Sequence, residues 1–299
     1  KLRQTRDEHH RRGLVVMATG LGKTWLAALD VAAFGEEIGA CPKVLFLAHR
    51  REILKQAART LRVLMRSRWP ETRFGWFVGP GGSLAGDVVF ASVQKLGRKQ
   101  YLDTLERHHF DYVVVDEVHH ATAPSYQRIL DHLEPRFVLG LTATPERSDE
   151  ADVLGLFDDN LVHRADLGVG IASGHLVPFA YFGLKDDVDY ANIPWRNKRF
   201  DPVELAKAVQ TEQRMARMWQ ACQEHSGKRT LFFCTSVSHA DYVRRWLSER
   251  GQRVCAVHSG DTADDRSEAL PAPRVLTGLP FRFGQRLVHT GLIGHGTPP

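Results

Sequence analysis

The sequence predicts an α/β fold built on parallel sheets, and three observations lead to it. Short apolar segments alternate with longer amphipathic segments over residues 14–142, and a second series of the same kind begins near residue 202. The short segments are almost continuously apolar, which is typical of strands buried on both faces of a sheet. The amphipathic segments are long enough to connect parallel strands as crossover helices. With 299 residues, 43% of them hydrophobic, the chain can form about two domains of ordinary globular composition.

The elements of the first domain follow one another along the chain. The predicted strands are runs rich in Val, Leu and Phe, and they cover residues 14–20, 43–48, 87–92, 111–117 and 136–142. The predicted helices carry apolar residues at helical spacing, and they cover residues 23–37, 51–68 and 125–134. The pattern loosens over residues 165–200, where Gly, Pro and several acids occur together. We interpret this stretch as a connection between domains.

The second series of elements is shorter than the first. It consists of a helix over residues 202–225, a strand over 230–236, a helix over 239–250 and a strand over 254–260. From residue 270 onward there are five Gly and five Pro in 30 residues and no Asp, Glu or Lys, which does not fit the completion of a sheet. The sequence therefore predicts a first domain at 1–165, a linker at 166–201, half of a second domain at 202–270 and an atypical tail at 271–299.

The charge distribution and the cysteine content limit the classes of function that the sequence supports. The formal net charge is +5, but residues 1–12 and 270–299 each contribute +3, which leaves −1 for the rest. A nucleic-acid interaction must therefore come from individually placed residues. The cysteines are too scattered for a disulfide framework or a zinc site, at Cys41, Cys222, Cys234 and Cys255. No apolar run reaches the roughly 20 residues that span a bilayer, so we expect a cytoplasmic protein without a membrane partner.

The main chemical signal is the run MATGLGKT at residues 17–24, between a predicted strand and a predicted helix. Gly20 and Gly22 allow a tight turn in which backbone N–H groups and the helix N-terminus point at a phosphate. In such a loop Lys23 reaches the β- and γ-phosphates, and the Thr24 hydroxyl binds Mg²⁺. Met17 stands in place of the usual first glycine, so a plain glycine turn remains an alternative. The candidate nucleotide-binding residues are Thr19, Gly20, Leu21, Gly22, Lys23 and Thr24.

A second signal is DEVH at residues 116–119, which ends a strongly apolar strand. At the carboxyl edge of a parallel sheet, these carboxylates can lie beside the phosphate loop. There Asp116 would hold Mg²⁺ and Glu117 would polarise an attacking water. One acid alone could be a solvated strand end, but the pair together with Lys23 predicts hydrolysis of a nucleoside triphosphate.

A third signal is LTATPER at residues 141–147, directly after another apolar strand. The hydroxyls of Thr142 and Thr144, which flank Ala143, could relay the state of the γ-phosphate to the other domain. The same three residues also make a plausible turn before Pro145. Their chemistry alone does not decide between these two interpretations.

Together the three motifs resemble motifs I, II and III of superfamily 2 helicases of the DEAD/DEAH-box type, in the branch that includes type III restriction enzyme subunits. LAHRREIL (47–54), VVFASVQKL (88–96) and TLFFCTSVSHADYV (230–243) resemble motifs Ia, Ib and IV, and AVHSG (256–260) resembles the strand that follows. DDVDYANIPWR (186–196) looks like bacterial members of this branch, which often carry a phospholipase D-like nuclease domain. The resemblance covers roughly residues 13–270.

This resemblance implies an ATP-dependent motor with two RecA-like domains, with ATP and Mg²⁺ between them and nucleic acid across both. DNA is the expected partner, and RNA is the alternative. By the same resemblance, His119 couples hydrolysis to motif III. The residues expected to touch the phosphodiester backbone, without reading its sequence, are His49, Arg50, Ser92 and Gln94 in the first domain and Thr235, Ser236, His258 and Ser259 in the second. For Arg50, a solvated helix start is the competing interpretation.

The sequence also departs from the family. Members complete the second domain with a Gly-x-Asp motif V and with a motif VI whose arginine stabilises the transition state, and this sequence has neither. Such an arginine is worth about 10³–10⁵ in rate, so we expect the chain to bind ATP better than it hydrolyses it. We interpret the chain as a fragment with a truncated or frame-shifted tail, of a protein that could carry a further C-terminal region or nuclease domain.

Other functional classes were weighed against a helicase or translocase core. One is a nucleotide- and DNA-binding module without productive turnover. Another is a GTPase-like switch, because NKRF at residues 197–200 begins like a guanine signature, although the final aspartate is missing. A nuclease is the third, based on Asp186, Asp187 and Asp189, but no catalytic lysine or histidine accompanies them. The leading hypothesis couples ATP hydrolysis to strand movement.

Overall fold

The computed structural model describes residues 1–118, 124–143, 150–186, 188–196, 199–225 and 230–258. The chain divides into two compact units, Lys1–Leu176 and Val177–Pro299. None of the helices within the described ranges combines the length and hydropathy that a membrane-crossing segment requires.

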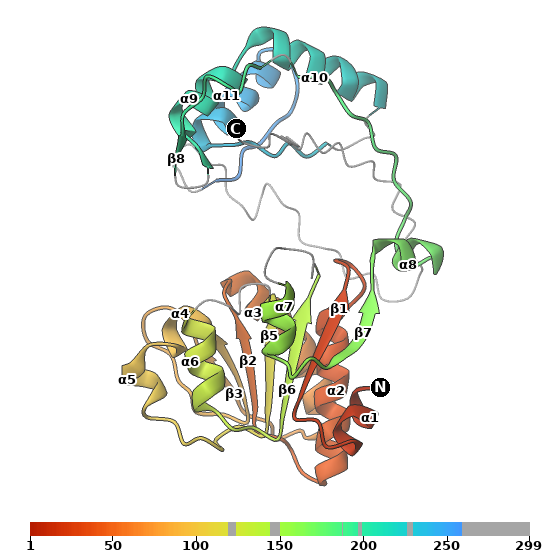
Figure 1. Ribbon diagram of the computed structural model, residues 1–299, viewed down its shortest axis with the longest axis vertical. Helices are drawn as coiled ribbons and strands as arrows, with labels where there is room; N and C mark the ends of the chain where they lie inside the picture. Colours follow the sequence, from red (N-terminus) through yellow and green to blue (C-terminus); the bar gives the residue numbers. More distant parts are fainter. Residues whose placement is uncertain (119–123, 144–149, 187, 197–198, 226–229, 259–299) are drawn as a thin grey trace. The chain divides into compact units, whose positions relative to one another are not determined.

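The first unit contains a seven-stranded sheet in the order β3-β4-β2-β5-β6-β1-β7 (Figure 1). Every pairing in this sheet is parallel, so the predicted α/β fold with a parallel sheet is confirmed. The strands are β1 (Arg12–Met17), β2 (Val44–Ala48), β3 (Phe74–Phe77), β4 (Val88–Ser92), β5 (Tyr112–Asp116), β6 (Phe137–Thr142) and β7 (Leu161–Ala165). Parallel strands need long return connections, and helices supply most of them.

Helices cover both faces of this sheet. Helices α2 (Lys23–Ile38) and α3 (Arg51–Arg68) pack on one face, together with the short α1 (Leu2–Asp7). The other face is covered by α4 (Val93–Leu96), α5 (Lys99–Leu102), α6 (Pro124–His132) and α7 (Glu150–Gly155). Helix α8 (Leu167–Ala172) follows the edge strand β7. Coverage on both faces explains why the central strands are apolar throughout.

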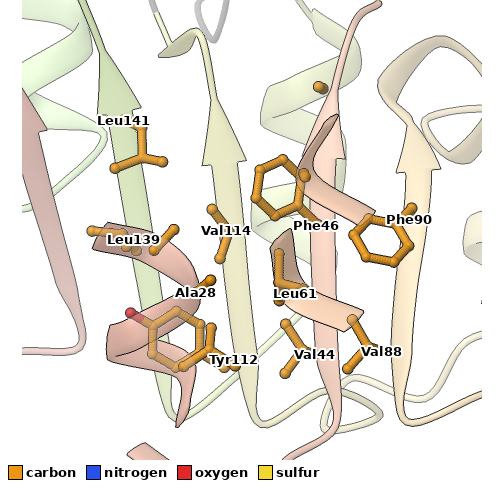
Figure 2. Close-up of a cluster of buried hydrophobic side chains, with 14 of the residues drawn as sticks. Ala28, Val44, Phe46, Leu61, Val88, Phe90, Tyr112, Val114, Leu139 and Leu141 are labelled. Carbon is orange, nitrogen blue, oxygen red and sulfur yellow. The ribbon is translucent and has the colours of Figure 1, made fainter. Parts of the chain in front are cut away.

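Alternate residues of each strand enter opposite halves of the core. In β2, Phe46 packs against α2 and α3, whereas its neighbour Leu47 packs on the opposite face. Figure 2 shows the first half, in which Ala28 and Leu61 from the two helices meet side chains of four neighbouring strands. The side chains of Ala28, Phe46, Leu47 and Leu61 are all essentially inaccessible to solvent. A core of this kind fixes the register of the strands, because a slip of one residue would exchange the two faces.

A buried charge network fastens α1 to the rest of the unit. The Arg6 guanidinium donates to Asp30 at 2.7 Å and to Glu37 at 2.8 Å, and only 9% of its side chain is exposed. The Tyr112 hydroxyl also donates to Asp30. Burial by itself lowers the pKa of Arg6, but the hydrogen bonds to Glu37 and Asp30 outweigh it, so the pKa is raised. The network lies where β5 begins, at the opposite end of the strand from Asp116.

The second unit is helical in its described part. It contains α9 (Pro202–Val209), α10 (Glu212–His225) and α11 (Val237–Ser248), and the two-residue antiparallel strands β8 (Trp195–Arg196) and β9 (Arg199–Phe200). One helix was predicted over residues 202–225, but the chain forms two. Asp201 accepts the N–H groups of Val203 and Glu204 to begin α9. Thr211 accepts the N–H of Arg214 at the start of α10, so the turn between them is capped independently.

The prediction of two strands in the second unit is wrong for the residues that the structure describes. Residues 230–236 and 254–258 are described, and neither segment is a strand. Leu231 and Phe233 are about half exposed instead of buried. Parallel strands are stable only when neighbours pair with them and helices cover both faces. The described part of this unit supplies no such sheet, so apolar strand-like sequence alone was not sufficient.

Candidate active site

The loop after β1 has the geometry of an anion site. Gly20 and Gly22 adopt φ values of +92° and +86°, which side chains rarely tolerate. Gly22 is the N-cap of α2, whose first N–H groups have no partner within the helix. Unpaired N–H groups and the helix dipole together favour a bound phosphate. Met17 is the last residue of β1, and as a strand residue it does not require the conformational freedom of the glycine that usually stands there.

Leu176, which is distant in sequence, packs beside this loop. A Cβ atom on Gly20 would lie 2.9 Å from Cδ2 of Leu176, so the leucine fills the space beside the glycine. A Cβ atom on Gly170 would lie 2.6 Å from Cδ1 of Leu176 and 2.9 Å from Cδ2 of Leu21. The Leu176 N–H donates to the Gly170 carbonyl at 2.9 Å, which turns the chain back after α8. Leu176 therefore restricts the conformations open to the loop.

Lys23 is the first residue of α2, directly after the loop, and its side chain is partly buried. Its ammonium donates to the Met17 carbonyl at 3.0 Å. Partial burial lowers the pKa of Lys23, and the negative charges of Glu117 and Asp116 oppose that shift. Lys23 lies at the same carboxyl edge of the sheet as Asp116 and Glu117. A phosphate group placed in the loop would be an alternative partner for the ammonium.

The Asp116–Glu117 pair is held in an unusual local conformation. Asp116 ends β5 and is 5% exposed. Glu117 has φ +57° although it is not glycine, and its N–H donates to Oδ1 of Asp116 at 2.9 Å. Burial and the charge of Glu117 raise the pKa of Asp116 to about 6, against the opposing effects of that N–H and of Lys23. Residues held in such conformations concentrate at functional sites, where the strain is part of the mechanism.

The sheet brings the third motif next to the first two. Strand β6 lies between β5 and β1, with Leu141 opposite Asp116 and Thr142 opposite Val16. Thr142 is buried at the end of β6 and Ala143 is half-buried. The three strand ends carrying Met17, Asp116 and Thr142 are therefore neighbours at one edge of the sheet. Parallel α/β sheets bind their ligands at this edge.

Tyr126 is a site residue that the sequence motifs did not indicate. It lies in the first turn of α6, is 3% exposed, and its hydroxyl has no hydrogen-bond partner among the residues that the structure describes. Burial raises the pKa of this phenol, and the charges of Asp116 and Glu117 raise it further. In the sequence, Tyr126, Ile129 and Leu130 have ordinary helical spacing, so the tyrosine is not distinguishable from a core residue.

The first unit also groups the predicted nucleic-acid contacts. His49 and Arg50 follow β2, and Ser92 ends the neighbouring strand β4, whose register places it opposite Ala48. The Gln94 side chain donates to the His49 carbonyl at 3.2 Å, and the Arg50 Nε donates to the His49 ring at 3.1 Å. These four residues lie together at the carboxyl edge of β2 and β4. His49, Arg50 and Gln94 are at least partly exposed and can offer imidazole, guanidinium and amide groups to a phosphate backbone, whereas Ser92 is buried.

The predicted contacts of the second unit surround the start of α11. The Ser236 hydroxyl accepts the His239 N–H and caps the helix, and Thr235 contacts the His239 ring. His258 lies 3.3 Å from Oδ1 of Asp241. Several predicted residues lie outside the described residues, namely His119, Thr144, Ser259, Asp187, Asn197 and Lys198.

Two of the three acidic residues considered for a nuclease, Asp186 and Asp189, make contacts within the described residues, and Asp187 lies outside them. Asp186 accepts from the Tyr190 hydroxyl at 2.8 Å and from Nε of Arg214 at 3.2 Å. Asp189 accepts from the Asn192 side chain and from a backbone N–H. Among the residues that the structure describes, no group of three metal-ligating side chains is present. These contacts favour the interpretation of Asp186 and Asp189 as residues that order their own segment.

Ionisation of Asp116 is expected to cost stability in the metal-free protein. Its pKa is about 6 in the folded chain and 3.8 as a free side chain, so the folded state binds the proton more tightly. Stability is therefore lost as the pH rises from about 4 to 6. Asp116→Asn is expected to stabilise the protein above pH 6 and to give no gain below pH 4. Unfolding midpoints in EDTA across this range test the sign, and a gain independent of pH would contradict it.

Comparison with known proteins gives consistent matches. Residues 1–147 match the family described as type III restriction enzyme, res subunit. The chain is 30% identical over 272 residues to the proposed mitochondrial ATP-dependent helicase irc3 of Schizosaccharomyces pombe, covering 88% of this chain and 44% of the relative. It is 28% identical over 300 residues to the proposed ATP-dependent helicase IRC3 of Saccharomyces cerevisiae, covering 95% and 42%. The chain thus spans less than half of the length of either relative.

A solved structure supports the fold alone. The ATP-dependent Type ISP restriction-modification enzyme LlaBIII bound to DNA matches with a TM-score of 0.57 and 16% sequence identity. The match covers 82% of this chain and 20% of that one. At this identity the match shows a shared architecture and no more.

Proposed function

We propose that this chain binds Mg-ATP at the loop after β1. The chain belongs to the superfamily 2 helicases, in the branch of the type III restriction enzyme res subunit. Hydrolysis would take place at Asp116 and Glu117. The observation that carries this proposal is that Lys23, at the start of α2 after β1, and Asp116, at the end of β5, lie at the same carboxyl edge of the sheet, where β5, β6 and β1 are neighbours. Phosphoryl transfer requires a cation that binds the phosphates, a carboxylate that holds the metal and a carboxylate that orients the attacking water.

Each side chain has a role in this proposal. The N–H groups at the start of α2 and the Lys23 ammonium would hold the phosphates. The Thr24 hydroxyl and the Asp116 carboxylate fit Mg²⁺, which prefers oxygen ligands and would neutralise charge on the phosphates. The buried, hydrogen-bonded Asp116 is suited to this because its ionisation is costly until a cation is present. Glu117 would orient and polarise the attacking water, and Thr142 and Ala143 would respond to the γ-phosphate.

The proposed partner is DNA. The relatives are described as ATP-dependent helicases, and the solved enzyme of similar fold is described as bound to DNA. His49, Arg50, Ser92 and Gln94 form a polar group suited to a phosphodiester backbone. Contacts of this kind position a strand without selecting its sequence. We therefore propose a translocase or helicase core.

Replacing Lys23 with alanine is expected to weaken Mg-ATP binding by about 10–100-fold, because a charge-assisted hydrogen bond to phosphate is lost. Titration of a fluorescent ATP analogue measures the affinity, and release of phosphate with and without duplex DNA measures turnover. Lys55→Ala is the matched control, since this lysine is exposed on α3. Equal affinity of both variants would refute the assignment of the loop. Tight binding without any turnover would instead favour a nucleotide-binding module.

A further inference from the structure

The hydroxyl of Tyr126 occupies a place in the core that a phenylalanine would fill more favourably. Its ring belongs to the apolar cluster that includes Val115, Val118 and Ile129. The oxygen is buried and has no hydrogen-bond partner among the described residues. A buried polar group without a partner costs the free energy of its lost hydration. An unpaired group of this kind in a native structure requires an explanation.

The position of α6 suggests that explanation. Tyr126, in the first turn of α6 (Pro124–His132), belongs to the same buried cluster as Val115 and Val118. These valines flank Asp116 and Glu117 at the end of β5, so this turn lies near the carboxyl end of that strand. Side chains on a helix lean toward its N-terminus, which brings the Tyr126 ring over this turn. Arg128 donates to the Gly97 carbonyl at 3.1 Å and fixes α6 against the end of α4. The effect of Asp116 and Glu117 on the phenol agrees with this proximity.

We propose that Tyr126 is a positioning residue, whose hydroxyl donates a hydrogen bond to the Asp116–Glu117 pair, or to water held by that pair, when the site is loaded with Mg-nucleotide. The inference rests on the proposed function. Without nucleotide the hydroxyl has no partner among the residues that the structure describes, and it would gain one from the two carboxylates, or from water that they hold, in the loaded site. The hydroxyl therefore stabilises the nucleotide-loaded state through a hydrogen bond, whereas its burial destabilises the empty state.

Two matched substitutions separate this role from a structural one. Tyr126→Phe removes a hydroxyl without a partner at the carboxyl end of β5. Tyr112→Phe removes the same group at the other end of β5, where it donates to the buried Asp30. In EDTA, Tyr126→Phe is expected to leave the unfolding midpoint unchanged or higher, and Tyr112→Phe is expected to lower it. The opposite signs follow from the presence or absence of a partner.

The decisive measurement is the affinity for AMP-PNP, a non-hydrolysable ATP analogue, with and without Mg²⁺. With Mg²⁺, Tyr126→Phe is expected to bind about ten-fold more weakly than the unmodified chain, as for one hydrogen bond to a charged group. In EDTA the two are expected to bind equally, and Tyr112→Phe is expected to match the unmodified chain in both conditions. Equal affinities with Mg²⁺, or a midpoint lowered as in Tyr112→Phe, would overturn the role of Tyr126 alone. No binding of AMP-PNP by the unmodified chain would overturn the proposed function and this inference together.

Discussion

Glu117→Gln is expected to reduce DNA-stimulated ATP hydrolysis by about 10²–10⁴-fold, the range for loss of a general base. Affinity for Mg-ATP should change only a few-fold. Glutamine has the same size and can keep the backbone conformation, including the N–H that donates to Asp116. It cannot draw a proton from water. The change therefore acts on the bond-breaking step, whereas Lys23→Ala acts first on binding.

Turnover and binding must be measured on the same protein preparation to test this expectation. Single-turnover phosphate release gives the chemical step, and titration with AMP-PNP gives the affinity. Glu106→Gln is the matched control, because Glu106 is exposed in the same unit and lies outside the motifs. Unchanged turnover in Glu117→Gln would remove Glu117 from the mechanism. A parallel loss of affinity and turnover would assign it to binding.

Arg6→Ala is expected to lower the free energy of unfolding of the first unit by about 3 kcal/mol, as when one member of a buried ion pair is removed. Asp30 and Glu37 would keep their charges but lose their main cation. The guanidinium also lies over the rings of Phe34 and Phe137, at 5.6 Å and 5.2 Å from their centroids. These contacts disappear with the side chain. The unfolding temperature should fall by roughly 6–12 °C for a unit of this size.

Arg3→Ala provides the control for Arg6→Ala. Arg3 approaches Glu37 only to 3.8 Å, and 73% of its side chain is exposed. Exposed pairs of this kind contribute about 0–1 kcal/mol. Thermal unfolding of the three proteins should therefore separate Arg6→Ala from the other two, while AMP-PNP affinity below the transition stays unchanged in all of them. Similar midpoints for both variants would show that the network contributes little.

The parallel sheet was predictable because its information is local. The strand predicted at 43–48 is β2 (Val44–Ala48), and the strand predicted at 87–92 is β4 (Val88–Ser92). Each is a mostly apolar run that begins directly after a charged residue, Lys43 or Asp87, and such runs indicate burial on both faces. The motifs at the ends of such strands were predictable for the same reason. Lys23 and Asp116 could be singled out as candidate site residues because each carries a charge at a fixed spacing from the end of an apolar strand.

Contacts between distant residues were not predictable from these patterns. Nothing in the local sequence pairs Arg6 with Asp30, or places Leu176 against Gly20. The Tyr126 hydroxyl was hidden because a tyrosine at helical spacing looks like a core residue. In the second unit the failure was of another kind. The segment at 230–236 has the composition of a strand, but a strand also requires partners that a local pattern does not contain.

The packing of Leu176 has a consequence for where the nucleotide-binding unit ends. The last strand of the sheet ends at Ala165, but the side chain beside Gly20 belongs to Leu176, the final residue of the first unit. A polypeptide cut after β7 would keep every strand and lose the support of its phosphate loop. The shortest autonomous version of this unit should therefore retain α8 and the turn that follows it.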